Sequence, residues 1–298
     1  MKTSAKLTTI ILSLLILIIG CKKKEEVKKT IVSVKGSDTM VNLSQKWAET
    51  YMKKNSNASI QVTGGGSGTG IAALLNGTVD IANASREFKQ KEYDNAKEKG
   101  VEPKEFKVAL DGIAIIVHPD NPIKALDLEQ LRKIFTGEIK NWKEIGGNDS
   151  PITLYGRENS SGTYEFFKDK VLGKDANGNS RDFATSTQVL QGTAALGEAI
   201  ARDNKGIGYG GVGYFALRTD VKILQVKEDK DAPAIAPAAD GKVNYEAIWS
   251  GEYSISRYLY CYTNGTPSAK IQKFMDFIIS QEGQDLVKQM EYIPLPQK

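Results

Sequence analysis

One pattern constrains this chain more than any other: a strand-like run, a turn rich in Gly, Ser and Thr, and a helix-like run follow one another three times. The three segments are residues 34–40, 62–70 and 155–163. Each turn would present free backbone N–H groups and hydroxyl donors at the start of a helix, where the helix dipole adds partial positive charge. Any one of them is also explained as an ordinary capped helix start. Three in one chain, one of them with Arg157, predict an anion-binding site.

Strand and helix patterns alternate along the rest of the chain. Leu43, Trp47 and Tyr51 recur at a spacing of four and predict a helix, and residues 271–290 predict one long final helix. Apolar or β-branched runs such as 79–82 predict short strands. This alternation is typical of an α/β fold with mainly parallel strands, and such folds bind ligands at the carboxyl ends of their strands.

Composition argues against several classes of function. The chain has 298 residues with one histidine and two cysteines, which leaves no Cys/His zinc cluster and argues against a Ser-His-Asp or Cys-His hydrolase. The formal net charge of +4 is too small to indicate a nucleic-acid partner. A Walker loop needs Gly-Lys-Ser/Thr at its end, but Gly70 is followed by Ile71. We therefore predict that the chain is not an enzyme and that it has no catalytic residue, no cofactor and no metal.

Residues 1–20 are predicted to be a lipoprotein signal peptide. Two lysines precede the apolar run 10–19, which is too short to span a bilayer as a helix and fits a secretory signal. A small residue and Cys21 follow the run and resemble a bacterial lipobox, which implies cleavage before Cys21 and lipidation of its thiol. The alternatives are an uncleaved anchor or a secretory signal with an incidental cysteine. Residues 21–30 are rich in lysine and predict a solvated, charged tether.

Six motifs follow one another between residues 31 and 298. They are Gly-Ser-Asp-Thr at 36–39, the glycine loop at 64–70, Val-Asp-Ile-Ala-Asn-Ala-Ser-Arg at 79–86, Gly-Ile-Ala-Ile-Ile-Val-His-Pro at 112–119, the segment 157–163, and Gly-Ile-Gly-Tyr-Gly at 206–210. With these motifs in this order, the chain resembles the substrate-binding lipoproteins of bacterial phosphate ABC transporters, which are type II periplasmic binding proteins. The order of the motifs carries the resemblance more than any one of them.

The resemblance implies an architecture. The fold would be α/β, with two lobes, each built on a mainly parallel sheet flanked by helices. Lobe one would contain residues 31–112 and 253–298, and lobe two residues 113–252. Two chain crossovers, near Asp111-Gly112 and near 254–258, would form a two-segment hinge.

The resemblance also implies a function: high-affinity binding of inorganic phosphate in the cleft between the lobes and its delivery to the permease subunits of an ABC transporter for import. The protein would be a monomer in the cell envelope. It would be held on the periplasmic or extracytoplasmic face of a membrane by the lipid on Cys21.

The phosphate contacts of the family carry over by position, as hydroxyl, backbone N–H and guanidinium donors from both lobes. The implied phosphate-binding residues are Thr39, Met40, Ser67, Ser85, Arg86, Arg157, Ser161, Gly162 and Thr163. Arginine offers a planar fork that can donate to two oxygens of one anion, which lysine cannot.

One loop departs from the pattern of many family members. They place an aspartate after the strand at 79–82, where it accepts the proton of the ligand and so rejects fully ionised oxyanions. This chain has Ser85 and Arg86 in that loop. Ser85 is a predicted donor, whereas Arg86 either binds the anion or pairs with Glu87 or another acid.

Asp38 or Asp111 could supply the missing acceptor, but a structural role is predicted for each. Asp38 would cap a helix, and Asp111 would brace the hinge. Two other classes of function therefore stay open. The site could bind another oxyanion (sulfate, molybdate or tungstate) or a small anionic metabolite, or the scaffold could serve an enzyme or an adhesive surface lipoprotein.

Overall fold

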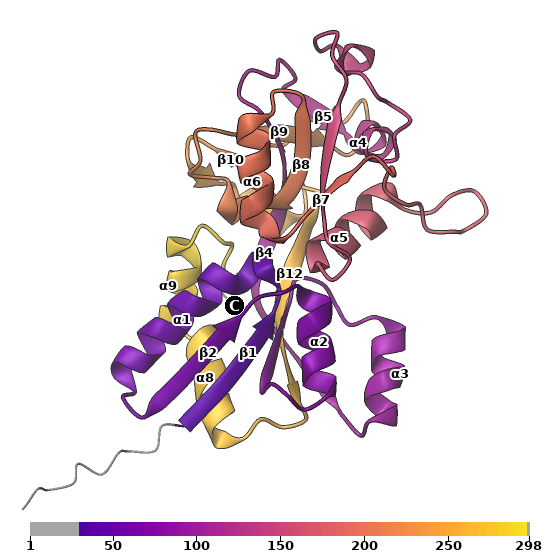
Figure 1. Cartoon of the computed structure of the whole chain (residues 1–298). Coiled ribbons are helices and arrows are strands. Elements are labelled where there is room, and N and C mark those ends of the chain that lie inside the picture. Colours follow the sequence, from indigo (N-terminus) through magenta and orange to yellow (C-terminus); the bar gives the residue numbers. More distant parts are fainter. Residues whose placement is uncertain (1–29, 297–298) are drawn as a thin grey trace, which may run out of the picture.

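The computed structural model describes residues 30–296 (Figure 1). The predicted signal peptide and residues 21–29 of the predicted tether, with Cys21, lie outside the described residues. Within residues 30–296, no helix is both long enough and apolar enough to cross a membrane. Strands and helices alternate along the chain, which confirms the predicted α/β class.

The elements form a lower and an upper lobe (Figure 1). The lower lobe contains β1 (Thr30–Gly36), η1 (Asp38–Met40), α1 (Val41–Lys54), β2 (Ala58–Thr63), α2 (Ser67–Leu75), β3 (Ile81–Ala84) and α3 (Gln90–Glu98). β4 (Pro103–Val117) leads into the upper lobe, which contains β5 (Ala125–Asp127), α4 (Leu128–Phe135), η2 (Trp142–Ile145), β6 (Thr153–Arg157), α5 (Gly162–Phe167), η3 (Lys168–Leu172), β7 (Gln188–Leu190), α6 (Gly192–Arg202), β8 (Gly206–Gly211), η4 (Val212–Tyr214), β9 (Lys222–Lys227), β10 (Ala238–Ala239), β11 (Lys242–Val243) and α7 (Tyr245–Ser250). The chain returns through β12 (Ser256–Asn264) to α8 (Ala269–Ile279) and α9 (Gln281–Gln289).

The main sheet passes through both lobes. Its strands follow the order β2-β1-β3-β12-β4-β8-β6-β7, with β5 and β9 joined at the side. β1 is parallel to β2 and β3, and β6 is parallel to β7 and β8, whereas β4 is antiparallel to β12 and β8. The two-lobed α/β fold is confirmed. The two separate, mainly parallel sheets that we expected are corrected to one mixed sheet, because β4 carries the hydrogen bonding from one lobe into the other.

β4 changes its partner where the two lobes join. It pairs with β12 up to Gly112 and with β8 from Ile113 onward. In this region Arg257 of β12 stands opposite Asp111 of β4. The division of the chain into lobes at the predicted residues stays a prediction, because strand pairing does not establish which residues move as one body.

Each lobe has its own apolar core. In the lower lobe Leu43 and Trp47 of α1 are fully buried, and the Trp47 indole N–H donates to the Gly283 carbonyl at 2.8 Å. In the upper lobe the rings of Phe167 and Tyr209 stack with centroids 4.0 Å apart. The helix predicted from the spacing of four is confirmed as α1.

Two helices, α8 and α9, replace the single final helix that we predicted. Ser280 is extended, with φ −66° and ψ 165°, and its hydroxyl accepts a hydrogen bond from the Gly283 N–H, so it caps α9. Gly283 also packs tightly on the end of α8, since a Cβ there would lie 2.2 Å from the Phe277 carbonyl oxygen. The prediction was wrong because the apolar spacing continues through the break.

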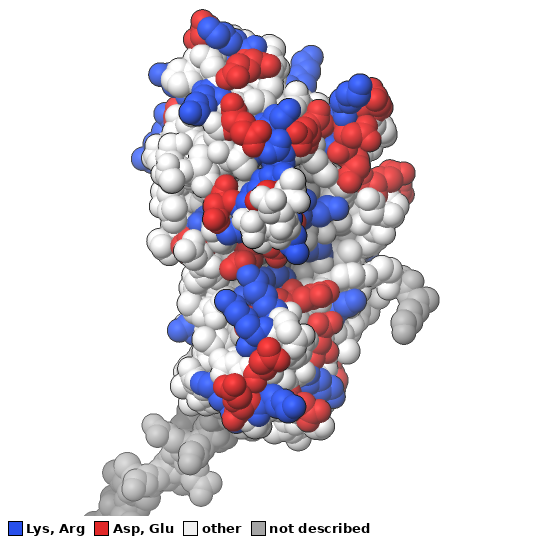
Figure 2. Space-filling model, turned by 90° about the vertical axis from the view of Figure 1, so that its right-hand side faces the viewer, with Lys and Arg blue, Asp and Glu red and all other residues white. Residues whose placement is uncertain are grey.

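The face that carries α3 and α5 mixes both signs of charge. Lysine and arginine side chains alternate with aspartate and glutamate over this face (Figure 2). Such a surface differs from the basic stripe that usually marks a nucleic-acid-binding face.

Candidate anion-binding site

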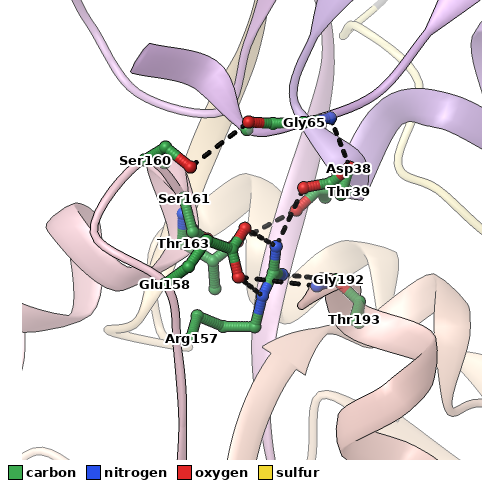
Figure 3. Close-up of polar contacts among 12 residues, drawn as sticks. Asp38, Thr39, Gly65, Arg157, Glu158, Ser160, Ser161, Thr163, Gly192 and Thr193 are labelled. Carbon is green, nitrogen blue, oxygen red and sulfur yellow. Dashed lines mark hydrogen bonds and ion pairs between the residues drawn. The ribbon is translucent and has the colours of Figure 1, made fainter. Parts of the chain in front are cut away.

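The three glycine-rich turns meet between the lobes (Figure 3). The hydroxyl oxygens of Thr39 and Thr163, which come from opposite lobes, are 2.9 Å apart. The Gly68 N–H donates to the Ser160 carbonyl at 3.0 Å, and the Ser160 hydroxyl donates to the Gly65 carbonyl at 3.2 Å. The structure thus brings all three turns to one place.

Gly162 allows the second and third turns to come this close. A Cβ at Gly162 would lie 2.2 Å from Ser67 Oγ and 2.6 Å from Ser85 Oγ. Ser161, the residue before it, is the N-cap of α5 and accepts a hydrogen bond from the Thr163 N–H at 3.2 Å. The third turn therefore starts α5 directly against the hydroxyls of the lower lobe.

Five buried hydroxyl groups lie where the turns meet. They belong to Thr39, Ser67, Ser85, Ser161 and Thr163, none of which exposes more than 1 % of its area. The Ser67 and Ser85 oxygens are 3.3 Å apart, and the Ser85 N–H donates to Ser67 Oγ at 3.1 Å. A hydroxyl can rotate to donate or to accept, so this cluster can hydrogen-bond to the oxygens of a small anion.

The Met40 N–H, which the resemblance assigns to the ligand, has a partner inside its own turn. It donates to the Ser37 carbonyl at 3.0 Å, at the start of η1. The Met40 side chain is fully buried in the core of the lower lobe. Beside it, the Ser37 hydroxyl is buried without a hydrogen-bond partner.

Arg157 is buried in a network of acids (Figure 3). Its guanidinium donates twice to Glu158, at 2.8 and 3.0 Å, once to Asp38 at 3.1 Å and once to the Thr193 hydroxyl at 2.8 Å. Burial raises the pKa of Glu158, but the hydrogen bonds and charge of Arg157 outweigh it and hold that pKa below its usual value. We expected Asp38 to cap its own helix, and that prediction was wrong. Its carboxylate instead accepts a hydrogen bond from the Gly65 N–H at 2.8 Å.

Arg257 is a buried arginine at the site that the sequence analysis missed. Its Nη2 lies 2.9 Å from the Thr163 hydroxyl and 3.3 Å from the Thr39 hydroxyl, and its Nη1 donates to the Gly162 carbonyl at 3.2 Å. One feature of the sequence could have pointed to Arg257: it lies in the predicted hinge segment near residues 254–258. The other predicted hinge segment contains Asp111.

Asp111 forms the ionic partner of Arg257 across β4 and β12. Its Oδ2 accepts from Nη2 at 2.9 Å and from Nε at 3.3 Å, and the carboxyl is fully buried. Burial raises the pKa of Asp111 above its usual value, against the opposing effect of Arg257. The pair joins the two strands at the place where β4 changes its partner. The role of Asp111 as a brace for a hinge stays a prediction.

Arg86 is held by an acid of its own lobe. It makes two hydrogen bonds of 2.8 Å to the Glu92 carboxylate and one of 2.8 Å to the Glu87 carbonyl, while its Nε is buried without a partner. Of the two roles left open for Arg86, the structure shows the pair with an acid, and that acid is Glu92. Among residues 30–296, no group of three or more His, Cys, Asp and Glu side chains is arranged to hold a metal ion.

Comparison with known proteins identifies the family. A family model described as a PBP superfamily domain matches residues 23–282. The "Phosphate-binding protein PstS" of Pseudomonas aeruginosa is 34 % identical over 280 residues, which cover 88 % of this chain and 82 % of that protein. The PstS protein of Bacillus subtilis is 34 % identical over 276 residues, covering 92 % of this chain and 83 % of that protein. The chain belongs to the PstS family of the PBP superfamily.

Solved structures agree with this membership of the PstS family. A putative phosphate ABC transporter substrate-binding protein from Clostridium perfringens, determined with bound phosphate, is 32 % identical. It superimposes with a TM-score of 0.76 and covers 90 % of this chain and 100 % of that chain. An ABC-type phosphate transport receptor from Vibrio cholerae is 26 % identical, with a TM-score of 0.69 and coverage of 89 % and 100 %. The family and the fold that the resemblance predicted are therefore confirmed.

Proposed function

We propose that this protein binds inorganic phosphate between its lobes and delivers it to a phosphate ABC transporter for import. The observation that carries the proposal is the meeting of Thr39 and Thr163, hydroxyls of opposite lobes, 2.9 Å apart beside a buried guanidinium. The relatives named above, one of them determined with bound phosphate, support the same function. Their names describe binding and transport, and we propose that this chain is likewise not an enzyme.

The chemistry of the site suits a small tetrahedral anion. Phosphate has four oxygens and needs many donors at close range, and buried hydroxyls, backbone N–H groups and an arginine supply them. Hydrogen bonds to a charged partner are roughly twice as strong as neutral ones. Because donors come from both lobes, a bound anion would favour the closed state through contacts that an open state cannot make.

We assign the oxygens of the anion to donors from both lobes, with an arginine to balance the charge. The proposed donors are Thr39, Ser67 and Ser85 from the lower lobe and Ser161, Gly162 and Thr163 from the upper lobe. The Met40 N–H stays a prediction from the resemblance, and it would have to give up or share its bond to the Ser37 carbonyl. The bidentate pair with Glu92 favours a supporting role for Arg86 at the edge of the site. Arg157 is the proposed arginine, since it begins the third turn and its guanidinium reaches Asp38 in the first turn at 3.1 Å.

Isothermal titration with phosphate, arsenate and sulfate over a series of pH values tests the proposal. Phosphate and arsenate have the same shape and similar protonation, so we expect both to bind and to compete, with sulfate far weaker. A protein that binds sulfate or an organic anion in preference to phosphate contradicts the proposed ligand. A protein that binds none of the three contradicts the proposed function.

We further propose that the mature protein is a monomer anchored on the extracytoplasmic face of a membrane by a lipid on Cys21, close to the permease subunits that receive the phosphate. A single acyl chain anchors weakly, whereas several chains hold a protein stably. Cys21→Ser should therefore move the protein from the membrane fraction to the soluble fraction, with unchanged phosphate affinity. If the variant stays in the membrane fraction, the anchor is not the lipid on Cys21.

A further inference from the structure

A surface groove of about 550 Å³, which we call the rear groove, separates α7 of the upper lobe from the α8–α9 corner of the lower lobe. Trp249 of α7 and the C-terminal residues Pro294 and Leu295 line it from one side, and Ile279 and Lys288 line it from the other. Trp249 exposes 41 % of its area and Ile279 exposes 45 %. Each lobe thus contributes a large apolar side chain that is only half buried.

The rear groove lies on the opposite side of the hinge strands from the proposed phosphate site. The Asp111 side chain of β4 points toward the site, where it pairs with Arg257. A Cβ on the next residue, Gly112, would lie 2.8 Å from the Ile248 side chain of α7. Because successive residues of a strand point to opposite faces, α7 and Trp249 pack against the face of β4 that is turned away from the site.

The C-terminal segment crosses between the lobes beside the rear groove, in addition to the two crossings that we predicted. Tyr292 is buried in the core of the lower lobe, whereas Ile293 is buried in the core of the upper lobe. After this crossing, the Pro294 carbonyl accepts a hydrogen bond of 2.9 Å from the Trp249 indole. The N–H of the next residue donates to Gln284 Oε1 of α9 at 2.8 Å. The segment therefore has contacts on both sides of the groove.

The lobes touch each other on the side of the phosphate site. The hydroxyls of Thr39 and Thr163 are 2.9 Å apart, and the Gly68 N–H donates to the Ser160 carbonyl at 3.0 Å, so this is a closed arrangement of the lobes. Two bodies that turn about a hinge separate on one side as they approach on the other. Opening the cleft at the phosphate site would therefore narrow the rear groove.

We propose that the rear groove closes when the phosphate cleft opens, and that Trp249 and Ile279 then bury each other and stabilise the open state. The inference rests on the proposed binding of phosphate. Removal of apolar surface from water is favourable, so this contact opposes closure. A ligand that binds the closed state has a lower apparent affinity when the open state is more stable. The rear groove thus limits phosphate affinity without touching the ligand.

A polar substitution in the rear groove should therefore tighten phosphate binding. In Ile279→Gln of the full chain the open state loses its apolar contact, whereas the closed state, in which Ile279 is already half exposed, loses less. We expect the dissociation constant for phosphate to fall by roughly fivefold in titrations. Leu217→Gln is the matched control, because Leu217 is an exposed apolar residue of the upper lobe that does not line the groove. An unchanged or weaker affinity of Ile279→Gln overturns the proposal.

Tryptophan fluorescence reports the movement directly. The chain has three tryptophans, and Trp47 and Trp142 are fully buried. Acrylamide should therefore quench the wild-type protein more strongly with phosphate than without it, because closure of the cleft exposes Trp249. Trp249→Phe should lose this difference. Equal quenching of the wild-type protein with and without bound phosphate overturns the proposal.

Small-angle X-ray scattering of the ligand-free protein gives a test that does not depend on phosphate. We expect the wild-type protein to be more extended than the closed structure, and Ile279→Gln to be shifted toward the closed dimensions. Ligand-free wild-type protein that already has the closed dimensions overturns the proposal. Wild-type protein that is open but does not bind phosphate contradicts the proposed function and not the role of the groove. If thermal unfolding shows that Ile279→Gln does not fold, quenching and scattering of the wild-type protein decide.

Discussion

At the scale of single residues, the site depends on Gly162 having no side chain. An added Cβ would lie 2.2 Å from Ser67 Oγ, so Gly162→Ala should force the third turn away from the second. Overpacking of this kind costs about 1–3 kcal/mol, and we expect phosphate binding to weaken by roughly 5- to 150-fold, measured by titration. Gly68→Ala is the matched control, because a Cβ there has its nearest neighbour 3.5 Å away. Equal losses in both variants contradict this role for Gly162.

The residue scale also shows what a sequence can and cannot predict. Thr39, Ser67 and Thr163 could be found because each follows a strand and a glycine within a few residues. Arg257 could not, because its burial depends on Asp111, which is 146 residues away in the chain. The sequence also could not show which acid pairs with Arg86. Glu92 lies in α3, and the sequence alone does not determine how that helix packs.

Glu158 should make the stability of the protein depend on pH. Burial raises its pKa, but Arg157 holds the net pKa below the usual value of about 4.3. A carboxyl with a lowered pKa in the folded state contributes stability above its unfolded pKa and loses it as the pH falls through the folded pKa. Glu158→Gln should therefore be less stable than wild type at pH 7, with a difference that shrinks from about pH 5 downward. Urea unfolding at several pH values measures this, and a difference independent of pH is the contrary result.

At the scale of elements, helix caps decide where helices begin. Asp127 accepts a hydrogen bond of 2.7 Å from the Gln130 N–H, while the Gln130 side chain accepts one of 3.0 Å from the Asp127 N–H, which forms a capping box at α4. Asp127→Ala should lower the free energy of unfolding by about 1 kcal/mol, measured by urea unfolding. Asp127→Asn keeps an acceptor and should lose much less. Equal losses would mean that the cap contributes little.

The boundaries of elements were predicted well where chemistry marked them. Ser161 marks the start of α5 within the third of the predicted turns, and Asp127 marks the start of α4. The break at Ser280 was missed because serine is compatible with a helix interior and the apolar spacing runs on. What places the break is the contact of Gly283 with α8 and with Trp47, and such contacts form only in the folded molecule.

At the scale of the whole molecule, contacts between the lobes determine how firmly the closed state holds. Lys89 of the lower lobe forms an ion pair with Glu165 of α5 in the upper lobe, and Lys89 also lines a pocket of about 570 Å³ between the lobes. Neither side chain is fully buried, with exposed fractions of 30 % and 22 %. Such a pair contributes about 0–1 kcal/mol. Unlike the Thr39–Thr163 contact, it involves none of the proposed phosphate donors, so we expect it to act on the equilibrium between open and closed states.

Removing this ion pair should change the dissociation of phosphate and little else. In Glu165→Gln the closed state loses one contact while every proposed donor stays in place, so the dissociation rate constant should rise by up to about fivefold in stopped-flow measurements. High salt should reduce the difference from wild type, because it screens an exposed pair. Asp149→Asn is the matched control, since it breaks an ion pair with Lys143 that lies within the upper lobe. If both variants release phosphate at the wild-type rate, the Lys89–Glu165 ion pair plays no part in closing the lobes. The closed state then depends on the ligand and on the buried contacts of Arg157 and Arg257.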